Sequence, residues 1–420
     1  MNYKILRVIN VNFETIFDTF YKNKINSDNF LSLKKSFFDQ SYVWCNSFAE
    51  RMAEIGNEAI DIIYNFEELQ NMWRLEHSNN QKIDFEKDLN EKLFLIFLEQ
   101  IKFYKPDILY FQHCAPFTSD KLKYIKDNFL FIKKIIFHNG FLLNDDQIKN
   151  VDIILGCLPV YKSHYENLGI KSFLIYHYFD ENILNKISLK NKKKNNVIFF
   201  GKTGSIKNDN HSLRHNFIKE LISQDSFYFF SVEKHRSLLI KKNFKKILRD
   251  LIINKLKYLP DKIIYFLFDN LNNNKIKRIL EDTKKSLTEK TFLHEQFPNK
   301  INKSLYGIEM FQLLRDNNFA LNIHSDQSDI DCGNLRMFEA TGVGSCLLTE
   351  YKTNLIDLFD PDEEVVTYKS KDELLSKLKE IKNNYKIIEE ISQKGQKRTL
   401  NNHTTSIRVN EIDKLIQREL

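Results

Sequence analysis

Residues 334–350 read NLRMFEATGVGSCLLTE, which predicts a short helix, a Gly-x-Gly turn at Gly342 and Gly344, and an apolar strand. A strand-like segment, ALNIH at 320–324, precedes this stretch and is followed by a loop rich in Asp. In a parallel sheet, such a unit places a helix N-terminus at the carboxyl edge of the strands, where unpaired N–H groups bind anions. Glu339, on the first turns of the helix, could accept the two hydroxyls of a ribose. Together these features predict a nucleoside diphosphate site.

The length and composition indicate a two-domain globular enzyme. The chain has 420 residues, more than one compact core usually holds. Hydrophobic residues make up 42% and charged residues 28%, which is ordinary for such a protein. No apolar stretch approaches the roughly 18 residues that span a bilayer, and the N-terminus MNYKILRVINVNFE resembles a first strand rather than a signal peptide. We therefore expect a soluble, cytoplasmic protein.

The cysteines fit the same compartment. They are scattered and form no Cys-x-x-Cys pair, which indicates reduced thiols and argues against a zinc site; they are Cys45, Cys114, Cys157, Cys332 and Cys346. We accordingly expect no zinc site in the protein.

The positive charge is local. The formal net charge is +7, and the segment 234–262 holds ten Lys and Arg against two acids. Apolar residues recur at helical spacing there, which predicts either a helix packed on its own domain or an interfacial helix resting on an anionic inner membrane leaflet. Nucleic acid is a poor partner, because the segment has few aromatics and the rest of the chain is not basic.

Strand-like and helix-like stretches alternate from the start of the chain, which is typical of a parallel sheet covered by helices. Amphipathic helices are expected at 42–56 and 86–104. The strand candidates are residues 4–11, AIDIIY at 59–64, DILYFQ at 107–112, FIKKIIFH at 131–138, DIILGC at 152–157 and SFLIYH at 172–177. Residues 1–185 are therefore predicted to form one doubly wound, Rossmann-like domain on the acceptor side.

A second alternating series follows a polar linker, KISLKNKKKNN at 186–196. It opens with VIFFGKTGS at 197–205 and predicts a second Rossmann-like domain over 197–400, with a helix over 401–420. Two such α/β domains would face each other across a central cleft.

A glycine and a lysine end the first strand of that second series. The string GKTGS suggests a phosphate-binding loop, but Gly-x-x-x-x-Gly-Lys would require a glycine at position 196, where Asn196 stands, so we reject an ATPase. Gly201 could let the backbone approach a ligand, and Lys202 could neutralise a departing diphosphate. The alternative is a surface lysine in a turn.

Histidines also stand at predicted strand ends. His138 ends FIKKIIFH, so it should face the cleft and could act as the general base that deprotonates an acceptor hydroxyl. His113 is the second candidate and Asp145 the third; the alternative for His138 is a buried, hydrogen-bonded histidine. His324 could contact the donor phosphate or sugar, or hold the following loop.

Three segments together resemble the CgeB-like, family 1-type glycosyltransferases, which have a GT-B fold: KSLYGIEMFQLLRDNNFALNIH, the stretch from NLRMFEATGVGSCLLTE to KSKDELL, and KGQKRTLNNHTTSIRV. The N-terminal half is similar more faintly, at 41–77 and 151–180. The basic segment 234–290 looks longer than its counterpart in relatives, which suggests an insertion.

The resemblance implies a metal-independent hexosyl-type transferase that needs no cofactor and binds a nucleotide sugar in its second domain. Glu339 falls on the ribose-binding acid, and Asn334 and Arg336 fall on the Asn-x-Arg that precedes it. Gly342 and Gly344 fall on the turn after it. Asp331 is the first acid of an acid–seven residues–acid spacing, although Glu is usual there. A Glu339 buried in an ion pair with no room beside it would argue against this assignment.

We therefore expect a glycosyltransferase that moves a sugar from a nucleoside-diphosphate sugar to a hydroxyl of a glycan, lipid-linked or protein acceptor. The family suggests bacterial surface glycan, lipopolysaccharide or protein glycosylation. A nucleotide-sugar epimerase of the same fold and a non-catalytic sugar-binding protein are the alternatives.

Overall fold

The computed structural model describes residues 2–11, 14–22, 28–42, 47–78, 88–112, 116–190, 193–204, 211–231 and 292–420. The predictions for His113, for the basic segment 234–262 and for the insertion at 234–290 lie outside these residues. So do Cys45, Cys114 and the side chain of Asp145.

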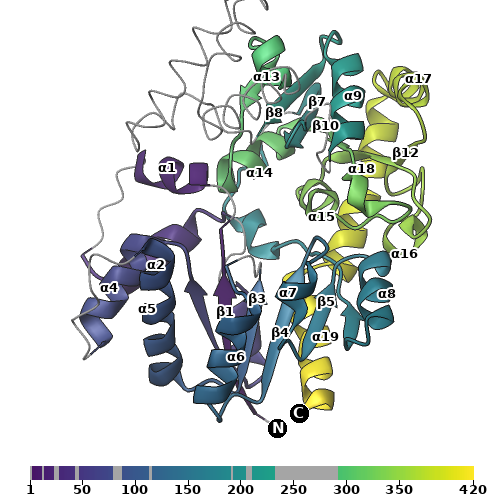
Figure 1. Cartoon of the computed structure of the whole chain (residues 1–420). Helices are drawn as coiled ribbons and strands as arrows, with labels where there is room; N and C mark the ends of the chain where they lie inside the picture. Colours follow the sequence, from purple (N-terminus) through teal and green to yellow (C-terminus); the bar gives the residue numbers. More distant parts are fainter. Residues whose placement is uncertain are drawn as a thin grey trace, which may run out of the picture. The chain divides into compact units, whose positions relative to one another are not determined.

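The first half of the chain forms a parallel six-stranded sheet in the order β2-β1-β3-β4-β5-β6 (Figure 1). Every predicted strand of this half is present. The strands are β1 (Lys4–Ile9), β2 (Glu58–Ile63), β3 (Ile108–Gln112), β4 (Lys134–Asn139), β5 (Ile153–Gly156) and β6 (Ser172–Leu174). Their near-continuous apolar sequences suit strands that are buried on both faces.

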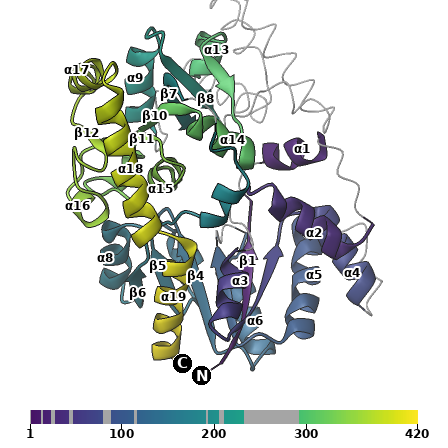
Figure 2. The same cartoon turned by 180° about the vertical axis from the view of Figure 1, so that it is seen from behind.

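Helices cover both faces of this sheet. On one face, α5 and α6 pack against alternate strand residues such as Leu109 and Phe137 (Figure 1). On the other face, α3 packs beside α19, the last helix of the chain, against residues such as Tyr110 and Ile136 (Figure 2). The helices of this half are α1 (Glu14–Lys22), α2 (Phe30–Asp39), α3 (Ser47–Glu54), α4 (Glu67–His77), α5 (Leu89–Tyr104), α6 (Ser119–Asn128), α7 (Asp145–Ile148), α8 (Pro159–Asn167) and η1 (Glu181–Asn185).

A second parallel six-stranded sheet has the order β12-β11-β10-β7-β8-β9. Its strands are β7 (Lys194–Gly201), β8 (Phe227–Ser231), β9 (Ile301–Lys303), β10 (Asn317–Asn322), β11 (Cys346–Glu350) and β12 (Val366–Tyr368). β7 begins three residues before the strand predicted at 197, so the end of the predicted linker is sheet. The strand order reverses between β7 and β10, and ligands of open α/β sheets bind at the carboxyl ends of strands beside such a reversal.

The helices of the second half include the helix expected after ALNIH, which is α15. They are α9 (Ser212–Leu221), α13 (Leu293–Gln296), α14 (Gly307–Arg315), η3 (Asp326–Ser328), α15 (Leu335–Gly342), α16 (Leu355–Leu358), α17 (Lys371–Ile381), α18 (Tyr385–Asn402) and α19 (Thr405–Glu419). None of the helices in the described ranges combines the length and the hydrophobicity that crossing a bilayer requires.

The chain divides into two compact units. One comprises Met1–Phe200, Gln224–Tyr228 and Leu305–Leu420, and the other comprises Gly201–Ser223 and Phe229–Ser304. The start of α15 and the carboxyl ends of β4, β5 and β6 belong to the first unit, whereas Gly201 and Lys202 belong to the second.

Candidate functional site

The start of α15 is tied to the carboxyl ends of two strands. The Nδ2 group of Asn334, the residue that precedes the helix, donates to Asn322 Oδ1 at the end of β10 over 2.6 Å. Asn322 in turn donates to Thr349 Oγ1 of β11 over 3.0 Å. These side chains fix the helix N-terminus at the sheet edge where the sequence predicted it.

His324 joins the same network. Its Nε2 atom lies 3.3 Å from Asn322 Nδ2 and 3.4 Å from Thr349 Oγ1, and its backbone N–H donates to the Glu350 carboxylate over 2.6 Å. The ring is buried, two residues beyond the end of β10. The structure therefore brings His324 and Asn334 together through Asn322, while a contact of His324 with a donor stays a prediction.

The N-terminus of α15 carries unsatisfied polar atoms. No side chain caps the helix, although Asn334 stands at the N-cap position. Asn334 Oδ1 and Arg336 Nε are both buried without a hydrogen-bond partner. A buried polar group left without a partner costs about 1–3 kcal/mol, so these atoms mark a place where a polar ligand would be stabilised.

Glu339 forms an ion pair with Arg336. The Arg336 Nη1 atom lies 2.8 Å from Glu339 Oε2, and the same nitrogen approaches the Met310 sulfur at 3.0 Å. The guanidinium also lies over the Phe200 ring, 5.2 Å from its centroid. Burial raises the pKa of Glu339, opposed by the positive charge of Arg336, and burial lowers the pKa of Arg336, opposed by Glu339.

The exposure of this ion pair decides whether Glu339 has room beside it for a ribose. The side chain of Glu339 retains 11% of its exposure and that of Arg336 retains 18%, so the pair is largely but not fully closed off from solvent. A cavity of about 400 Å³ lies elsewhere, beyond the other end of α15, where Gly344, Lys193 and Gln396 are among its lining residues and Glu339 is not. Glu339 is thus in an ion pair, and a ribose would have to share or displace Arg336.

Asp331 has a structural partner. Its Oδ2 atom accepts a hydrogen bond of 2.7 Å from the backbone N–H of Val160, in the first turn of α8. Leu158, at the N-cap position of α8, has an apolar side chain that cannot accept a hydrogen bond from the first turn of the helix. One carboxylate oxygen of Asp331 therefore caps α8, and its predicted contact with a donor sugar stays a prediction.

Gly342 and Gly344 lie at the C-terminal end of α15. A Cβ on Gly342 would lie 2.4 Å from the ring of Phe179, and Gly344 has a φ of +80°, which favours glycine. The helix has eight residues and is therefore about 12 Å long, so both glycines are distant from its N-terminus. Packing explains them, and any part in donor binding would be indirect.

Gly201 is the last residue of β7 and Lys202 follows it, both in the second compact unit. The Lys202 side chain is exposed, and its carbonyl accepts a hydrogen bond of 3.1 Å from Arg214 Nη1. Gly201 has a φ of +156°, and Gly204, with a φ of +76°, packs against the His211 backbone. Their predicted role in diphosphate binding stays a prediction.

His138 lies on β4, at the strand end that the sequence predicted, and its side chain is buried. The Nδ1 atom lies 2.6 Å from Tyr110 Oη, and the Nε2 atom lies 3.3 Å from the carbonyl oxygen of Ile175. Burial lowers the pKa of His138 to about 4. A neutral imidazole could accept a proton, but both nitrogens are engaged, so the predicted role as a base would require the ring to become accessible.

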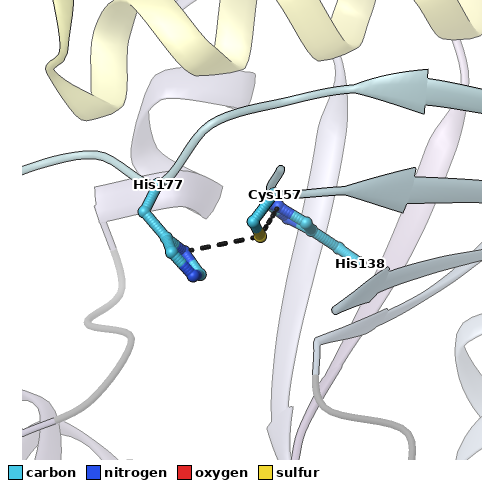
Figure 3. Close-up of side chains that lie close together, drawn as sticks. All are labelled: His138, Cys157 and His177. Atoms are coloured by element: carbon cyan, nitrogen blue, oxygen red, sulfur yellow. Dashed lines mark hydrogen bonds between the residues drawn. The ribbon is translucent and has the colours of Figure 1, made fainter. Parts of the chain in front are cut away.

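Two residues that the sequence reasoning did not single out stand beside His138. Cys157 Sγ lies 3.4 Å from His138 Nε2 and 3.7 Å from His177 Nδ1 (Figure 3). Burial raises the pKa of the Cys157 thiol and lowers the pKa of His177 to about 3. Within the described part of the chain, this is the group of His, Cys and acidic side chains close enough to hold a metal ion.

A sequence signal for this cluster did exist. The predicted strands FIKKIIFH, DIILGC and SFLIYH each end in a potential ligand residue: His138, Cys157 and His177. Strands β4, β5 and β6 are parallel neighbours, so their carboxyl ends meet at one sheet edge. Spacing within the sequence could not reveal this, because the ligands come from three separate strands.

Comparison with known proteins gives similar folds. The family model described as "Glycosyl transferase-like" matches residues 277–414. The Anabaena protein Alr3699/HepE in complex with UDP-glucose matches with a TM-score of 0.52 and 9% identity, over 99% of this chain and 100% of that chain. An alpha-glucosyltransferase in complex with UDP-glucose and DNA containing an abasic site matches with a TM-score of 0.52 and 11% identity, over the same shares. Sucrose-phosphate synthase from Thermosynechococcus elongatus matches with a TM-score of 0.51 and 9% identity, over 99% of this chain and 98% of that chain.

No curated protein sequence matches this chain. The structural similarities, at these low identities, establish the fold: two parallel six-stranded sheets with helices, as in GT-B proteins. The predicted fold class is confirmed.

Proposed function

We propose that this protein is a glycosyltransferase that binds a nucleoside-diphosphate sugar at the start of α15 and transfers the sugar to a hydroxyl acceptor. The match of residues 277–414 to the glycosyl transferase-like family and the GT-B fold support this proposal. Structures of similar fold hold UDP-glucose, a donor of the kind proposed.

The observation that carries the proposal is the set of polar groups at the α15 N-terminus. The helix start has no side-chain cap, Asn334 Oδ1 and Arg336 Nε have no partner, and Glu339 lies one turn further along. Backbone N–H groups at a helix N-terminus and the helix dipole both favour a negatively charged diphosphate. An anion bound at the helix start would lie about one helical turn from the Glu339 carboxylate.

The ion pair of Arg336 and Glu339 is compatible with a donor that rearranges it. A diphosphate at the helix N-terminus would compete with Glu339 for the Arg336 guanidinium, because guanidinium groups bind phosphate in the same bidentate manner as carboxylate. The freed Glu339 carboxylate would accept the ribose hydroxyls. The acceptor oxygen would then form a bond to the anomeric carbon as the bond to the diphosphate breaks, with the departing charge stabilised by the helix N-terminus and Arg336.

The proposal also covers the subtype of the enzyme, its base, its acceptor and its location. We infer a CgeB-like, hexosyl-type transferase whose transfer step needs no divalent metal, with His138 or His113 as the candidate base. The acceptor would be a glycan, a lipid-linked sugar or a protein, in bacterial surface glycan, lipopolysaccharide or protein glycosylation. A cytoplasmic location, with peripheral contact to the inner membrane through 234–262, completes this setting.

Thermal unfolding with a panel of nucleoside diphosphates tests the donor site. A ligand that binds only the folded protein raises its melting temperature, so at least one member of the panel should do so. The double variant Arg336→Met/Glu339→Leu should fold, since apolar replacement of a buried pair is often neutral or stabilising, but should lose the response. Glu390→Ala, an exposed acid on α18, is the matched control and should keep it.

Two outcomes would overturn the donor-site assignment. One is the absence of any nucleotide response in the wild type, which would favour a non-catalytic protein. The other is a full response in the double variant. Incubating nucleotide sugars of the responding nucleoside diphosphate without acceptor and following the sugar separates a transferase from an epimerase, because only an epimerase would isomerise the sugar.

A further inference from the structure

We propose that His138, Cys157 and His177 form a binding site for a zinc-class transition-metal ion at the carboxyl edge of the first sheet (Figure 3). The ligand atoms would be His138 Nε2, Cys157 Sγ and His177 Nδ1. This site is separate from the proposed nucleotide site and does not depend on it.

The spacing of the three atoms matches a tetrahedral site. Zinc bonds of about 2.3 Å to sulfur and about 2.0 Å to nitrogen, at a tetrahedral angle, place sulfur and nitrogen about 3.5 Å apart. The Cys157 sulfur lies 3.4 Å from one imidazole nitrogen and 3.7 Å from the other. All three ligand atoms lie within 4.8 Å of one another, so small rotations of the imidazole rings would complete the geometry.

The surroundings also suit a metal ligand set. Tyr110 Oη, 2.6 Å from His138 Nδ1, can accept the proton of that nitrogen and orient the ring, as outer partners of metal-bound histidines do. His138 lies within β4 and Cys157 directly follows β5, two adjacent strands of the sheet, so these two backbones are held in place, and His177 stands three residues beyond the end of β6.

The donor set selects the ion. One thiolate and two imidazoles are ligands for zinc-class ions, whereas magnesium and calcium require oxygen ligands. The two nearby cations, Arg7 and Arg408, are each paired with a carboxylate, from Asp61 and Glu411. The charges of both arginines are therefore balanced by carboxylates before a bound metal ion adds its own positive charge.

The competing explanation is a chain of ordinary hydrogen bonds. In that case His138 Nε2 donates to the Ile175 carbonyl, 3.3 Å away, and the Cys157 thiol donates to His177. The metal site would contradict two expectations from the sequence: that the chain has no zinc site, and that His138 is a base, because a metal-bound nitrogen cannot accept a proton.

Cobalt titration distinguishes a metal site from a chain of hydrogen bonds. The full-length protein is first freed of any purification tag and, by chelation, of metal. Co²⁺ should produce a thiolate-to-cobalt charge-transfer band and the intense visible bands of tetrahedral cobalt, saturating at one ion per chain. Zn²⁺ should remove these bands and raise the melting temperature. Cys157→Ser keeps a hydrogen-bonding group but should abolish the charge-transfer band.

Cys346→Ser is the matched control, because Cys346 is a buried thiol on β11 in the other sheet. It should retain the full signal. His177→Gln, a second ligand variant, should weaken Co²⁺ binding by at least about tenfold, and circular dichroism of the metal-free variants verifies that they fold. The proposal is overturned if the wild type shows no saturable charge-transfer band, or if Cys157→Ser retains it.

Discussion

At the scale of single residues, the central feature is that the buried charges of Arg336 and Glu339 compensate each other. Each side chain carries a desolvation cost that the other offsets, as the opposed pKa effects show. Such a pair contributes little net stability while both members are present, but loss of one leaves a buried charge without compensation. The pair is therefore a poor stabilising device and suits a site whose charges a ligand rearranges.

Glu339→Ala should accordingly lower the free energy of unfolding by about 3–5 kcal/mol, because Arg336 would remain buried and unpaired. Glu339→Gln should cost less, since the amide oxygen can still accept a hydrogen bond from Arg336. Denaturant unfolding of the wild type, both single variants and the double variant Arg336→Met/Glu339→Leu measures these differences. A Glu339→Ala protein as stable as the wild type would show that the ion pair does not persist in solution.

At the scale of elements, the loop between β10 and α15 serves two helices. Asn334 holds the start of α15 to Asn322 of β10, and Asp331 supplies the cap that α8 lacks. The loop thus orders the carboxyl edge of the second sheet and the N-terminus of α8 together. A polar loop of this kind is costly to bury unless its groups are paired, and these hydrogen bonds pair them.

Asp331→Ala should reduce the free energy of unfolding by about 1 kcal/mol, the usual cost of losing a helix N-cap. Asp331→Asn should retain most of the wild-type stability, because the amide oxygen can still accept a hydrogen bond from the Val160 N–H. Urea denaturation of both variants provides the comparison. Equal losses for Ala and Asn would mean that the charge of Asp331, rather than its hydrogen bond, matters for stability.

At the scale of the whole molecule, the C-terminal helix α19 returns to the sheet built by the first half of the chain. Val409, Ile412 and Ile416 enter the core on the face that α3 also covers. Asp413 accepts hydrogen bonds from Tyr3 Oη over 2.7 Å and from Asn57 Nδ2 over 2.8 Å. The last helix is therefore a structural part of the N-terminal sheet.

Ile412→Asp should lower the free energy of unfolding by at least about 3 kcal/mol, since it removes a buried aliphatic side chain and introduces a charge without a partner. Lys414→Asp, an exposed change on the same helix, should have a small effect. Thermal melts of the two variants measure the contrast. Similar melting temperatures would show that α19 is detached from the sheet in solution.

The sequence was sufficient to predict most secondary-structure elements and their order along the chain. Alternating apolar segments predicted β1 to β7, β10 and β11 to within a few residues, and the parallel α/β class followed from the intervening helices. It also predicted that α15 starts after β10 and that His138 ends a strand. These features depend on the periodicity of side chains along a short segment, which can be read directly from the residues.

The partners of individual side chains could be known only from the folded chain. The pairing of Glu339 with Arg336, the cap that Asp331 provides for α8, and the return of α19 to the first sheet join groups whose contacts local patterns do not encode. The meeting of His138, Cys157 and His177 is of the same kind. Periodicity determines which face of an element is apolar, but the side chains that share a buried space depend on how sheets, loops and the C-terminal helix pack together.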